Sequence, residues 1–216
     1  MKTLAVLGAS GHGKVVADTA LACGFTQVLF FDDAWPQRVA NGGWSVEGDS
    51  RTLLAEAGRF DGMLVAIGNC AVRLARQREL EAAGATLATL VHPRAWVSPG
   101  ARLGAGTVVM AGAVVNFDAV LGDACIVNTG ATVDHDCVLA DGVHVSPGAH
   151  LAGNVAVGAC SWLGIGCVVR QNIRIGTHVM AGAGAVLVAD IADSLTVAGN
   201  PARPLSPRSS GNSNPN

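Results

Sequence analysis

The sequence predicts a small α/β domain followed by a parallel β-helix, and two repeating patterns carry this prediction. From Val97 onward, an aliphatic residue recurs at every sixth position through sixteen consecutive hexads, with no residue inserted or skipped. Ahead of these hexads, short β-rich apolar runs alternate with stretches of helical spacing over residues 3–91. The first pattern is typical of hexapeptide solenoids. The second is typical of a parallel sheet whose strands are connected by helices.

Each hexad is interpreted as one short strand and one turn, with its large residue pointing into a narrow core. A second, mostly small residue follows each large one by four positions, and Cys125, Cys137 and Cys167 are among these small residues. Because each coil contacts only its two neighbours, no single rung should be essential for stability. The large positions are Val97, Leu103, Val109, Val115, Leu121, Val127, Val133, Leu139, Val145, Leu151, Val157, Leu163, Val169, Ile175, Ala181 and Leu187.

The N-terminal domain begins with the apolar run Thr3–Leu7, a glycine-rich turn and helical spacing over Lys14–Cys23. The turn reads Gly8-Ala9-Ser10-Gly11-His12-Gly13. In a strand, turn and helix of this kind, backbone N–H groups and the start of the helix can hold a phosphate group. The glycine spacing departs from the usual dinucleotide pattern, so a tight turn without a ligand is an equally weighted alternative.

Further elements alternate in the same way up to residue 91. The apolar run Gln27–Phe31 ends at Asp32 and Asp33, where a Rossmann-type unit places an acid near a ribose hydroxyl. Because the carboxyl ends of parallel strands meet at one edge of the sheet, we expect a ligand site there. The remaining predicted elements are a short helix over Ser50–Ala57, a strand over Gly62–Ile67 that ends at Gly68 and Asn69, a helix over Ala71–Ala83 and a fourth strand over Thr86–Val91.

These patterns divide the chain into a Rossmann-like domain over residues 1–93 and a β-helix over residues 94–205. Ser194–Leu205 reads as a final extended segment of the second domain. Residues 206–216 are polar residues, Gly and Pro, a composition typical of a disordered tail.

The composition excludes several classes of function. With a net charge of −2 and no basic patch or aromatic platform, the chain is not expected to bind nucleic acid. The longest apolar runs are too short to span a membrane, and the N-terminal run breaks into Gly and Ser too early for a signal peptide. The six cysteines form no CxxC pair, so we expect buried thiols in a reducing cytoplasm and no metal site.

The polar residues that interrupt the hexads are the candidates for catalysis. Asp134-His135-Asp136 places an imidazole between two carboxylates in one outward-facing turn. A carboxylate can hold one ring nitrogen as N–H and leave the other as a base near pH 7. A histidine that is merely solvated is the alternative reading.

His144 lies nine residues after His135, which is half a coil at three hexads per coil. The two histidines therefore lie on different edges of one subunit. They can share a substrate only across a subunit interface.

Several motifs together point to a family. They are Gly8-Ala-Ser-Gly-His-Gly13, Asp32-Asp33, Ala66-Ile67-Gly68-Asn69 with Arg73, His92-Pro93, Val133-Asp134-His135-Asp136-Cys137, His144-Val-Ser-Pro-Gly-Ala149, Leu151-Ala-Gly153-Asn154 and Gly199-Asn-Pro-Ala-Arg203. This combination resembles the hexapeptide-repeat sugar acetyltransferases. Within them it most resembles the nucleotide-amino-sugar N-acetyltransferases of the bacillosamine and perosamine pathways, which are grouped with sialic acid O-acetyltransferases.

The resemblance implies a left-handed parallel β-helix, a homotrimer and an N-terminal domain that holds the UDP part of an acceptor. It also implies acetyl-CoA as a co-substrate, with no tightly bound cofactor.

The resemblance assigns roles to single residues. His135 matches the catalytic base and Asp136 its orienting acid, although relatives often have Glu there and Asp134 competes for that role. His144 and the backbone N–H of Gly153 match positions that contact the acetyl group, and the Gly153 N–H is the candidate donor to an oxyanion. The implied nucleotide-sugar site comprises Gly8, Ser10, Gly11, His12, Gly13, Asp32, Asp33, Gly68, Asn69 and Asn128. The implied acetyl-CoA site comprises Gly164, Ile165, Gly182, Pro201 and Arg203.

The predicted function is acetylation of the amino group of a UDP-linked 4-amino-4,6-dideoxy sugar, with His135 taking the proton as the amine attacks the thioester. O-acetylation of a sialic acid or related sugar is the alternative in the same class. A trimeric zinc hydratase, with His135, His144 and His150 as ligands across an interface, is a more distant alternative. A non-enzymatic scaffold would leave the Asp-His-Asp cluster without a role.

Overall fold

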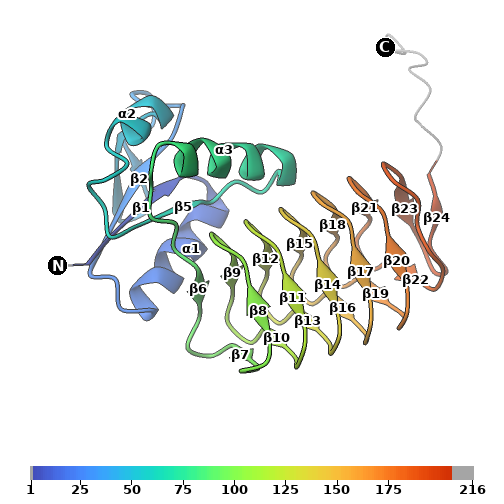
Figure 1. Cartoon of the computed structure of the whole chain (residues 1–216). Helices are drawn as coiled ribbons and strands as arrows, with labels where there is room; N and C mark the ends of the chain where they lie inside the picture. Colours follow the sequence, from blue (N-terminus) through green and yellow to red (C-terminus); the bar gives the residue numbers. More distant parts are fainter. Residues whose placement is uncertain (1, 206–216) are drawn as a thin grey trace, which may run out of the picture.

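A computed structural model describes residues 2–205 (Figure 1). An α/β domain comes first in the chain, and the coils of a parallel β-helix extend away from it in one direction (Figure 1). The β-helix is left-handed, as the family resemblance implies. The tail predicted over residues 206–216 lies outside the described residues.

The N-terminal domain contains one five-stranded sheet, in the order β3-β4-β2-β1-β5. Neighbouring strands are parallel except for β3 and β4, which pair antiparallel. The strands are β1 (Thr3–Leu7), β2 (Gln27–Phe31), β3 (Ala40–Asn41), β4 (Trp44–Gly48) and β5 (Gly62–Val65), and the helices are α1 (Gly11–Ala22), α2 (Ser50–Ala55) and α3 (Cys70–Ala82). The strands predicted over residues 3–7 and 27–31 are confirmed at both ends.

Both faces of this sheet are covered, which explains why its strands are continuous apolar runs. On one face, Leu4 and Val6 of β1 share a core with Val16 of α1. On the other face, Ala5 and Leu7 of β1 pack in a core that contains Leu53 of α2 and Leu80 of α3. Successive residues of a strand point to opposite faces, so β1 contributes to both cores.

The β-helix has three faces, which we call S1, S2 and S3. S1 consists of β6 (Leu90–Val91), β9 (Val108–Val109), β12 (Ile126–Val127), β15 (His144–Val145), β18 (Trp162–Leu163), β21 (Met180–Ala181), β23 (Thr196–Ala198) and β24 (Arg203–Pro204). S2 consists of β7 (Trp96–Val97), β10 (Val114–Val115), β13 (Thr132–Val133), β16 (His150–Leu151), β19 (Val168–Val169) and β22 (Val186–Leu187). S3 consists of β8 (Arg102–Leu103), β11 (Val120–Leu121), β14 (Val138–Leu139), β17 (Ala156–Val157) and β20 (Arg174–Ile175).

The register confirms the predicted coil of three hexads. Val115 of β10 pairs with Val133 of β13, and Val133 pairs with Leu151 of β16, so each step between coils is 18 residues. The predicted large and small positions together form one continuous core, in which Cys125, Cys137 and Cys167 are buried. The hexad pattern therefore predicted both the strands and the direction of their side chains.

The region between the domains differs from the sequence prediction. The predicted fourth strand over Thr86–Val91 is divided between the two domains: Leu87 forms a parallel bridge with Met63 of β5 beside the N-terminal sheet, whereas Leu90–Val91 pairs with β9 and begins the S1 face. Val91 lies one hexad before Val97 and packs against the β-helix core. The solenoid therefore starts one hexad earlier than the sequence suggested, and the short β3–β4 hairpin was not predicted at all.

The two domains share a hydrophobic cluster. Outward-facing residues of S1, including Val108, Met110 and Ile126, pack with Val16 and other residues of α1. Helix α3 lies alongside the first coils (Figure 1), where Arg78 pairs with Asp123 and Asp141 at 2.9 and 2.7 Å. These contacts join the N-terminal domain to the first coils of the β-helix.

Candidate functional site

A pocket of about 270 Å³ opens at the carboxyl edge of the N-terminal sheet, where β1, β2 and β5 end. This is the edge at which open α/β sheets bind ligands. Five of the residues predicted for a nucleotide site line it, together with four that were not predicted. The nine residues are Gly8, Ser10, Asp32, Asp33 and Gly68, then Leu7, Ala66, Ile67 and Arg76.

The three glycines of the β1–α1 turn have different structural roles. Gly8 has a φ of 110°, and an added Cβ would lie 2.8 Å from the Ala66 carbonyl oxygen, so the backbone itself requires glycine there. A Cβ on Gly13 would collide with the Gly8 carbonyl oxygen and lie 2.9 Å from the Phe30 ring. A Cβ on Gly11 would meet nothing within 4 Å. Gly13 therefore allows α1 to pack closely against the sheet, and Gly11 faces open space at the start of α1.

The two acids at the end of β2 also differ. Asp32 accepts hydrogen bonds from the Ala9 N–H at 2.7 Å and the Ala34 N–H at 2.9 Å, and it pairs with Arg38 at 3.0 Å. These contacts tie the glycine turn to the end of β2. Asp33 has a side chain that is 56% exposed, so it remains accessible to a ligand.

Asp33 accepts a hydrogen bond from the Ser50 N–H at 2.9 Å and pairs with Arg76 of α3 at 3.1 Å. Hydrogen bonds from Ser50 and the nearby Arg76 charge hold the pKa of Asp33 below its usual value. A carboxylate and a guanidinium thus lie side by side in the pocket wall. Arg76 was not predicted from the sequence, although it lies one helical turn beyond Arg73 on a helix that begins at the same sheet edge.

Asn69 does not line this pocket. Its side-chain oxygen accepts a hydrogen bond from the Val72 N–H at 3.0 Å and caps the start of α3. Asn69 also lines a second pocket, which it shares with Trp162 of the S1 face, and its place in the nucleotide site stays a prediction.

Two histidines lie close together where the N-terminal domain meets the S1 face: His12 is half-buried and His144 is buried. His12 lies in the first turn of α1 and His144 lies in β15, and their ring centroids are 6.4 Å apart. His144 stacks on Trp162 at 4.9 Å, and its Nε2 lies 3.2 Å from the side-chain nitrogen of Asn128. An amide nitrogen can only donate, so Nε2 of His144 is the unprotonated nitrogen in this contact.

Both histidines are neutral at pH 7. Burial, with the charge of Arg73 as a further cause, lowers the pKa of His12 to about 4 and that of His144 to about 3. The Gly68 carbonyl oxygen lies near His144 and acts in the opposite direction, but it raises the pKa of His144 by less than burial lowers it. Within residues 2–205, Nε2 of His12 and Nδ1 of His144 make no hydrogen bond of good geometry. Buried polar atoms of this kind are uncommon and fit groups that contact a ligand.

His135 lies in the turn between β13 and β14, on the edge that joins S2 to S3. Its side chain is 60% exposed, and its Nδ1 lies 2.7 Å from the Asp136 carboxylate. Asp134 is occupied elsewhere: it accepts hydrogen bonds from the His135 N–H at 2.8 Å and from the Asn116 side chain at 2.9 Å. Asp136, and not Asp134, therefore contacts the imidazole.

The contact with Asp136 sets the chemistry of His135. The hydrogen bond from the ring raises the pKa of His135, with smaller contributions from the charges of Asp134 and Asp136. With Nδ1 held as N–H by the carboxylate, Nε2 is left as a base that faces solvent.

Gly153 lies against His135 from the next coil. A Cβ on Gly153 would lie 2.5 Å from Cε1 and 2.6 Å from Nε2 of the His135 ring. The imidazole therefore occupies the space that any other residue at position 153 would fill.

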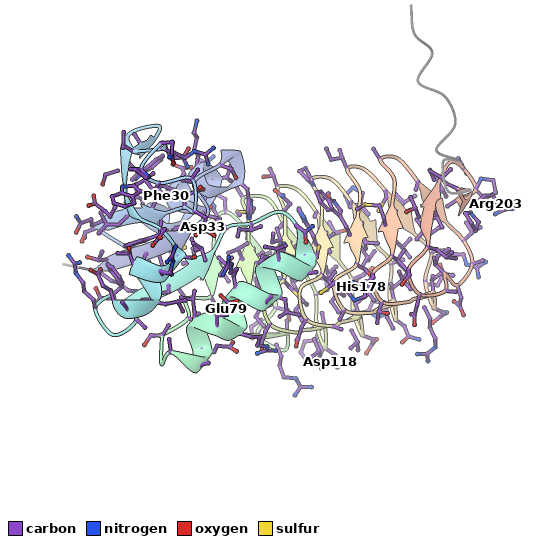
Figure 2. All side chains as sticks on the ribbon, turned by 90° about the horizontal axis from the view of Figure 1, so that it is seen from above. Phe30, Asp33, Glu79, Asp118, His178 and Arg203 are labelled. Carbon is purple, nitrogen blue, oxygen red and sulfur yellow. The ribbon has the colours of Figure 1, made fainter. Side chains whose placement is uncertain are left out.

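The residues predicted for acetyl-CoA lie along a different edge. Gly164 and Gly182 follow β18 and β21 of S1, at the same turn position that Asn128 takes after β12. Ile165 beside them is 62% exposed. Pro201 and Arg203 follow at the end of the solenoid, and Figure 2 shows Arg203 at the opposite end of the molecule from Asp33. The structure thus places Gly164, Ile165 and Gly182 in one row that continues from Asn128, whereas Arg203 lies in β24 of the S1 face.

The predicted residues form two groups within one chain. Asn128 and the acetyl-CoA row lie on the S1–S2 edge, with His144 beside them on the S1 face, whereas His135 and Gly153 lie on the S2–S3 edge. The S2 face separates His135 from Asn128. His144 lies on the S1 face and not on an edge as predicted, because the position half a coil from one edge of a three-sided coil is the opposite face.

No three His, Cys, Asp or Glu side chains within residues 2–205 are grouped so as to hold a metal ion. No helix in the same range is both long enough and apolar enough to cross a membrane.

Comparisons with known proteins cover most of the chain. Residues 3–80 match the family described as the PglD N-terminal domain. The acetyltransferase domain of PglB from Neisseria gonorrhoeae FA1090, solved in complex with acetyl coenzyme A, is 48% identical, with 94% of this chain and 99% of that chain covered and a TM-score of 0.91. PerB from Caulobacter crescentus, solved in complex with CoA and GDP-perosamine, is 38% identical, with 95% and 98% covered and a TM-score of 0.90.

A curated relative matches over a shorter stretch. The UDP-N-acetylbacillosamine N-acetyltransferase of Bacillus subtilis (strain 168) is 36% identical over 117 residues, which are 51% of this chain and 52% of that protein. The matched region of this chain thus spans about half the length of the curated relative.

Proposed function

This chain belongs to the family of acetyl-CoA-dependent sugar N-acetyltransferases, and on that premise we propose that it acetylates the amino group of a UDP-linked 4-amino-4,6-dideoxy sugar. Acetyl-CoA is the donor. The observation that carries the proposal is the contact between His135 and Asp136, which provides an exposed base at the edge of a hexapeptide solenoid.

The chemistry follows from the state of the two groups. The free amine of the sugar attacks the thioester carbonyl carbon, and Nε2 of His135 takes the proton that the nitrogen must lose. The Asp136 carboxylate stabilises the resulting imidazolium. As the tetrahedral intermediate collapses, the carbon–sulfur bond breaks, CoA leaves as the thiol after taking up the proton, and the product is an amide. A general base of this kind contributes typically ~100- to 10,000-fold to the rate.

The developing oxyanion needs a fixed donor. The backbone N–H of Gly153 lies in the coil next to His135, and we assign it this role. One such donor contributes about 3 kcal/mol to stabilising the transition state.

The acceptor is held through its nucleotide. The pocket at the N-terminal sheet edge offers the start of α1 for the diphosphate and the Asp33 carboxylate for ring or ribose donors. The printed name of the curated relative supports UDP, whereas the Caulobacter structure contains GDP-perosamine. A carboxylate can accept from the N–H of either base, and the assay below compares acceptors linked to both nucleotides.

The active protein is proposed to be a homotrimer. In one chain, His135 lies across the S2 face from His144 and Asn128, so a complete site requires the S2–S3 edge of one subunit to meet the S1–S2 edge of its neighbour. Closed threefold assembly repeats this contact at each of its interfaces. The free thiols and the use of acetyl-CoA support a cytoplasmic location.

The test is a direct assay with defined acceptors. The protein is incubated with acetyl-CoA and UDP-, GDP- or dTDP-linked 4-amino-4,6-dideoxy sugars, with release of the CoA thiol and the mass of the product as readouts. We expect acetylation of the UDP-linked sugar, and a product that resists hydroxylamine because it is an amide. A hydroxylamine-sensitive ester would instead identify an O-acetyltransferase, and transfer to the GDP-linked sugar alone would overturn the assignment of UDP.

A further inference from the structure

Arg73 is the largest fully buried side chain of the described residues, and none of the steps above uses it. It lies in the first turn of α3 and is 1% exposed. Buried arginines are usually paired with carboxylates. Within residues 2–205, however, no carboxylate lies within ion-pair distance of the Arg73 guanidinium.

Four backbone carbonyl oxygens surround this guanidinium. Nη1 donates to the carbonyl oxygens of Ile67 at 2.8 Å and Gly68 at 3.0 Å. Nε donates to Ala124 at 2.8 Å, and Nη2 donates to Gly142 at 2.7 Å. The planar fork of arginine presents donors in fixed directions, so these bonds set the relative positions of the groups that accept them.

The accepting groups belong to both halves of the site. Ile67 and Gly68 form part of the wall of the nucleotide pocket. Ala124 and Gly142 take the same turn position in two successive coils, directly before β12 and β15. Strand β12 leads to Asn128, and β15 begins with His144. One side chain therefore connects the pocket wall to the two strands that carry the polar residues nearest the expected reaction centre.

We propose that Arg73 is a positioning residue that sets the span between the nucleotide pocket and the reaction centre on the β-helix. The inference rests on the proposed function, because it assumes an acceptor that is held in the pocket and reacts near His144. An acceptor anchored by its nucleotide reacts well only if its sugar reaches the base at a set distance and direction. Arg73 fixes that distance from the protein side.

The main variant is Arg73→Lys. Lysine keeps the positive charge, but its single ammonium group cannot reach four carbonyl oxygens that lie around a planar fork. Arg78→Lys is the matched control, because Arg78 also connects α3 to these two coils through Asp123 and Asp141 but is half exposed and contacts no residue of the pocket wall.

The Michaelis constants for the nucleotide sugar and for acetyl-CoA are measured separately in each variant. For Arg73→Lys we expect the constant for the nucleotide sugar to rise about tenfold or more, since bonds to charged groups contribute about this much. The constant for acetyl-CoA should stay within about twofold of wild type, because its predicted residues lie farther along the solenoid. Arg78→Lys should change neither constant.

Comparing the two Michaelis constants distinguishes a positioning defect from a folding defect. Partial unfolding lowers the concentration of active enzyme and hence the apparent turnover, but it leaves both Michaelis constants unchanged. Unchanged constants in Arg73→Lys, or an equal rise in both, would overturn the role proposed for Arg73. Arg73→Met, which also removes the charge, provides a second test: it should raise the constant for the nucleotide sugar at least as far as Arg73→Lys does. A wild-type protein that acetylates no nucleotide sugar would instead contradict the proposed function itself.

Discussion

At the residue scale, the orientation of His135 depends on a local feature of the backbone. Asp136 has a φ of 60°, a left-handed conformation that Asp and Asn adopt more readily than most residues. In this conformation its carboxylate reaches Nδ1 of the preceding histidine at 2.7 Å.

Asp136→Asn tests this pairing through the pH dependence of the reaction. Asparagine tolerates the same backbone but carries no charge, so the imidazolium loses its stabilisation and the pKa of His135 falls. A lower pKa leaves the base free at lower pH, so the acidic limb of the kcat/KM profile should move to lower pH. We expect kcat to fall about ten- to a hundredfold, because the variant loses part of the rate enhancement that a well-oriented general base supplies.

The control for this variant is Asp118→Asn, one coil earlier. Asp118 has a φ of 59° at the equivalent turn position and forms no pair with a histidine. The pH profile of kcat/KM for Asp118→Asn should match that of wild type. An acidic limb that stays in place in Asp136→Asn would show that the carboxylate does not set the pKa of the base.

Gly153→Ala tests the space that the imidazole occupies. Alanine keeps the backbone N–H that we assign to the oxyanion, but its Cβ would lie 2.5 Å from the His135 ring and force the ring to move. We expect kcat to fall about tenfold or more, because an orientation error of this size weakens proton transfer. The thermal unfolding temperature should change little, since His135 is exposed. Gly58→Ala, which meets nothing within 4 Å, is the control, and a kcat within threefold of wild type in Gly153→Ala would contradict the assignment.

At the element scale, the turn between β1 and α1 combines packing with a candidate phosphate site. Gly13→Ala should destabilise the fold by about 1–3 kcal/mol, because its Cβ would collide with the Gly8 carbonyl oxygen.

Gly11→Ala should fold like wild type but raise the Michaelis constant for the nucleotide sugar about tenfold, since a methyl group at the start of α1 would block the approach of a phosphate. Denaturant unfolding and steady-state kinetics on both substrates check these outcomes. An equal rise in both Michaelis constants for Gly11→Ala would place the diphosphate elsewhere.

Periodic elements were predictable from the sequence, and elements without a period were not. The hexads predicted every coil from Val97 to Leu187, because each large residue must reach the same narrow core. The β3–β4 hairpin was missed because β3 has only two residues and shows no period, although Asn41-Gly42 is a turn signal and Trp44-Ser45-Val46-Glu47 alternates apolar and polar residues. Leu90–Val91 was assigned to the wrong sheet because a β-rich pair fits either one, and only its pairing with β9 decides between them.

The same reasoning explains which site residues were found. His135 and the glycine turn stand in local motifs, so they could be recognised in the sequence. Arg76 and the four contacts of Arg73 depend on how α3 lies against other elements, and no local pattern records that. The choice between Asp134 and Asp136 required coordinates, because both flank the histidine in the same turn.

At the scale of the whole molecule, the two groups of predicted residues lie on opposite edges of the S2 face. Mixed trimers test whether they meet between subunits. His135→Ala and His144→Ala chains with different affinity tags are co-expressed, and trimers that carry both tags are isolated. Some interfaces in these trimers place an intact His135 against an intact His144.

We expect mixed trimers to regain part of the wild-type activity while each parent is nearly inactive. The regained activity should scale with the fraction of interfaces that are intact. Mixed trimers no more active than the two parents would show that the two histidines do not act together across an interface.

The central claim is that His135 is the base for acetyl transfer to a nucleotide-linked amine, and His135→Ala tests it most directly. Single-turnover rates are measured with acetyl-CoA and the UDP-linked 4-amino sugar, alongside the affinity for acetyl-CoA and the oligomeric state. Because the side chain projects from a turn and is 60% exposed, we predict unchanged assembly and acetyl-CoA affinity. The acetyl-transfer rate should fall by at least ~100-fold. A rate within threefold of wild type, in a variant that is folded and binds acetyl-CoA, would contradict the claim.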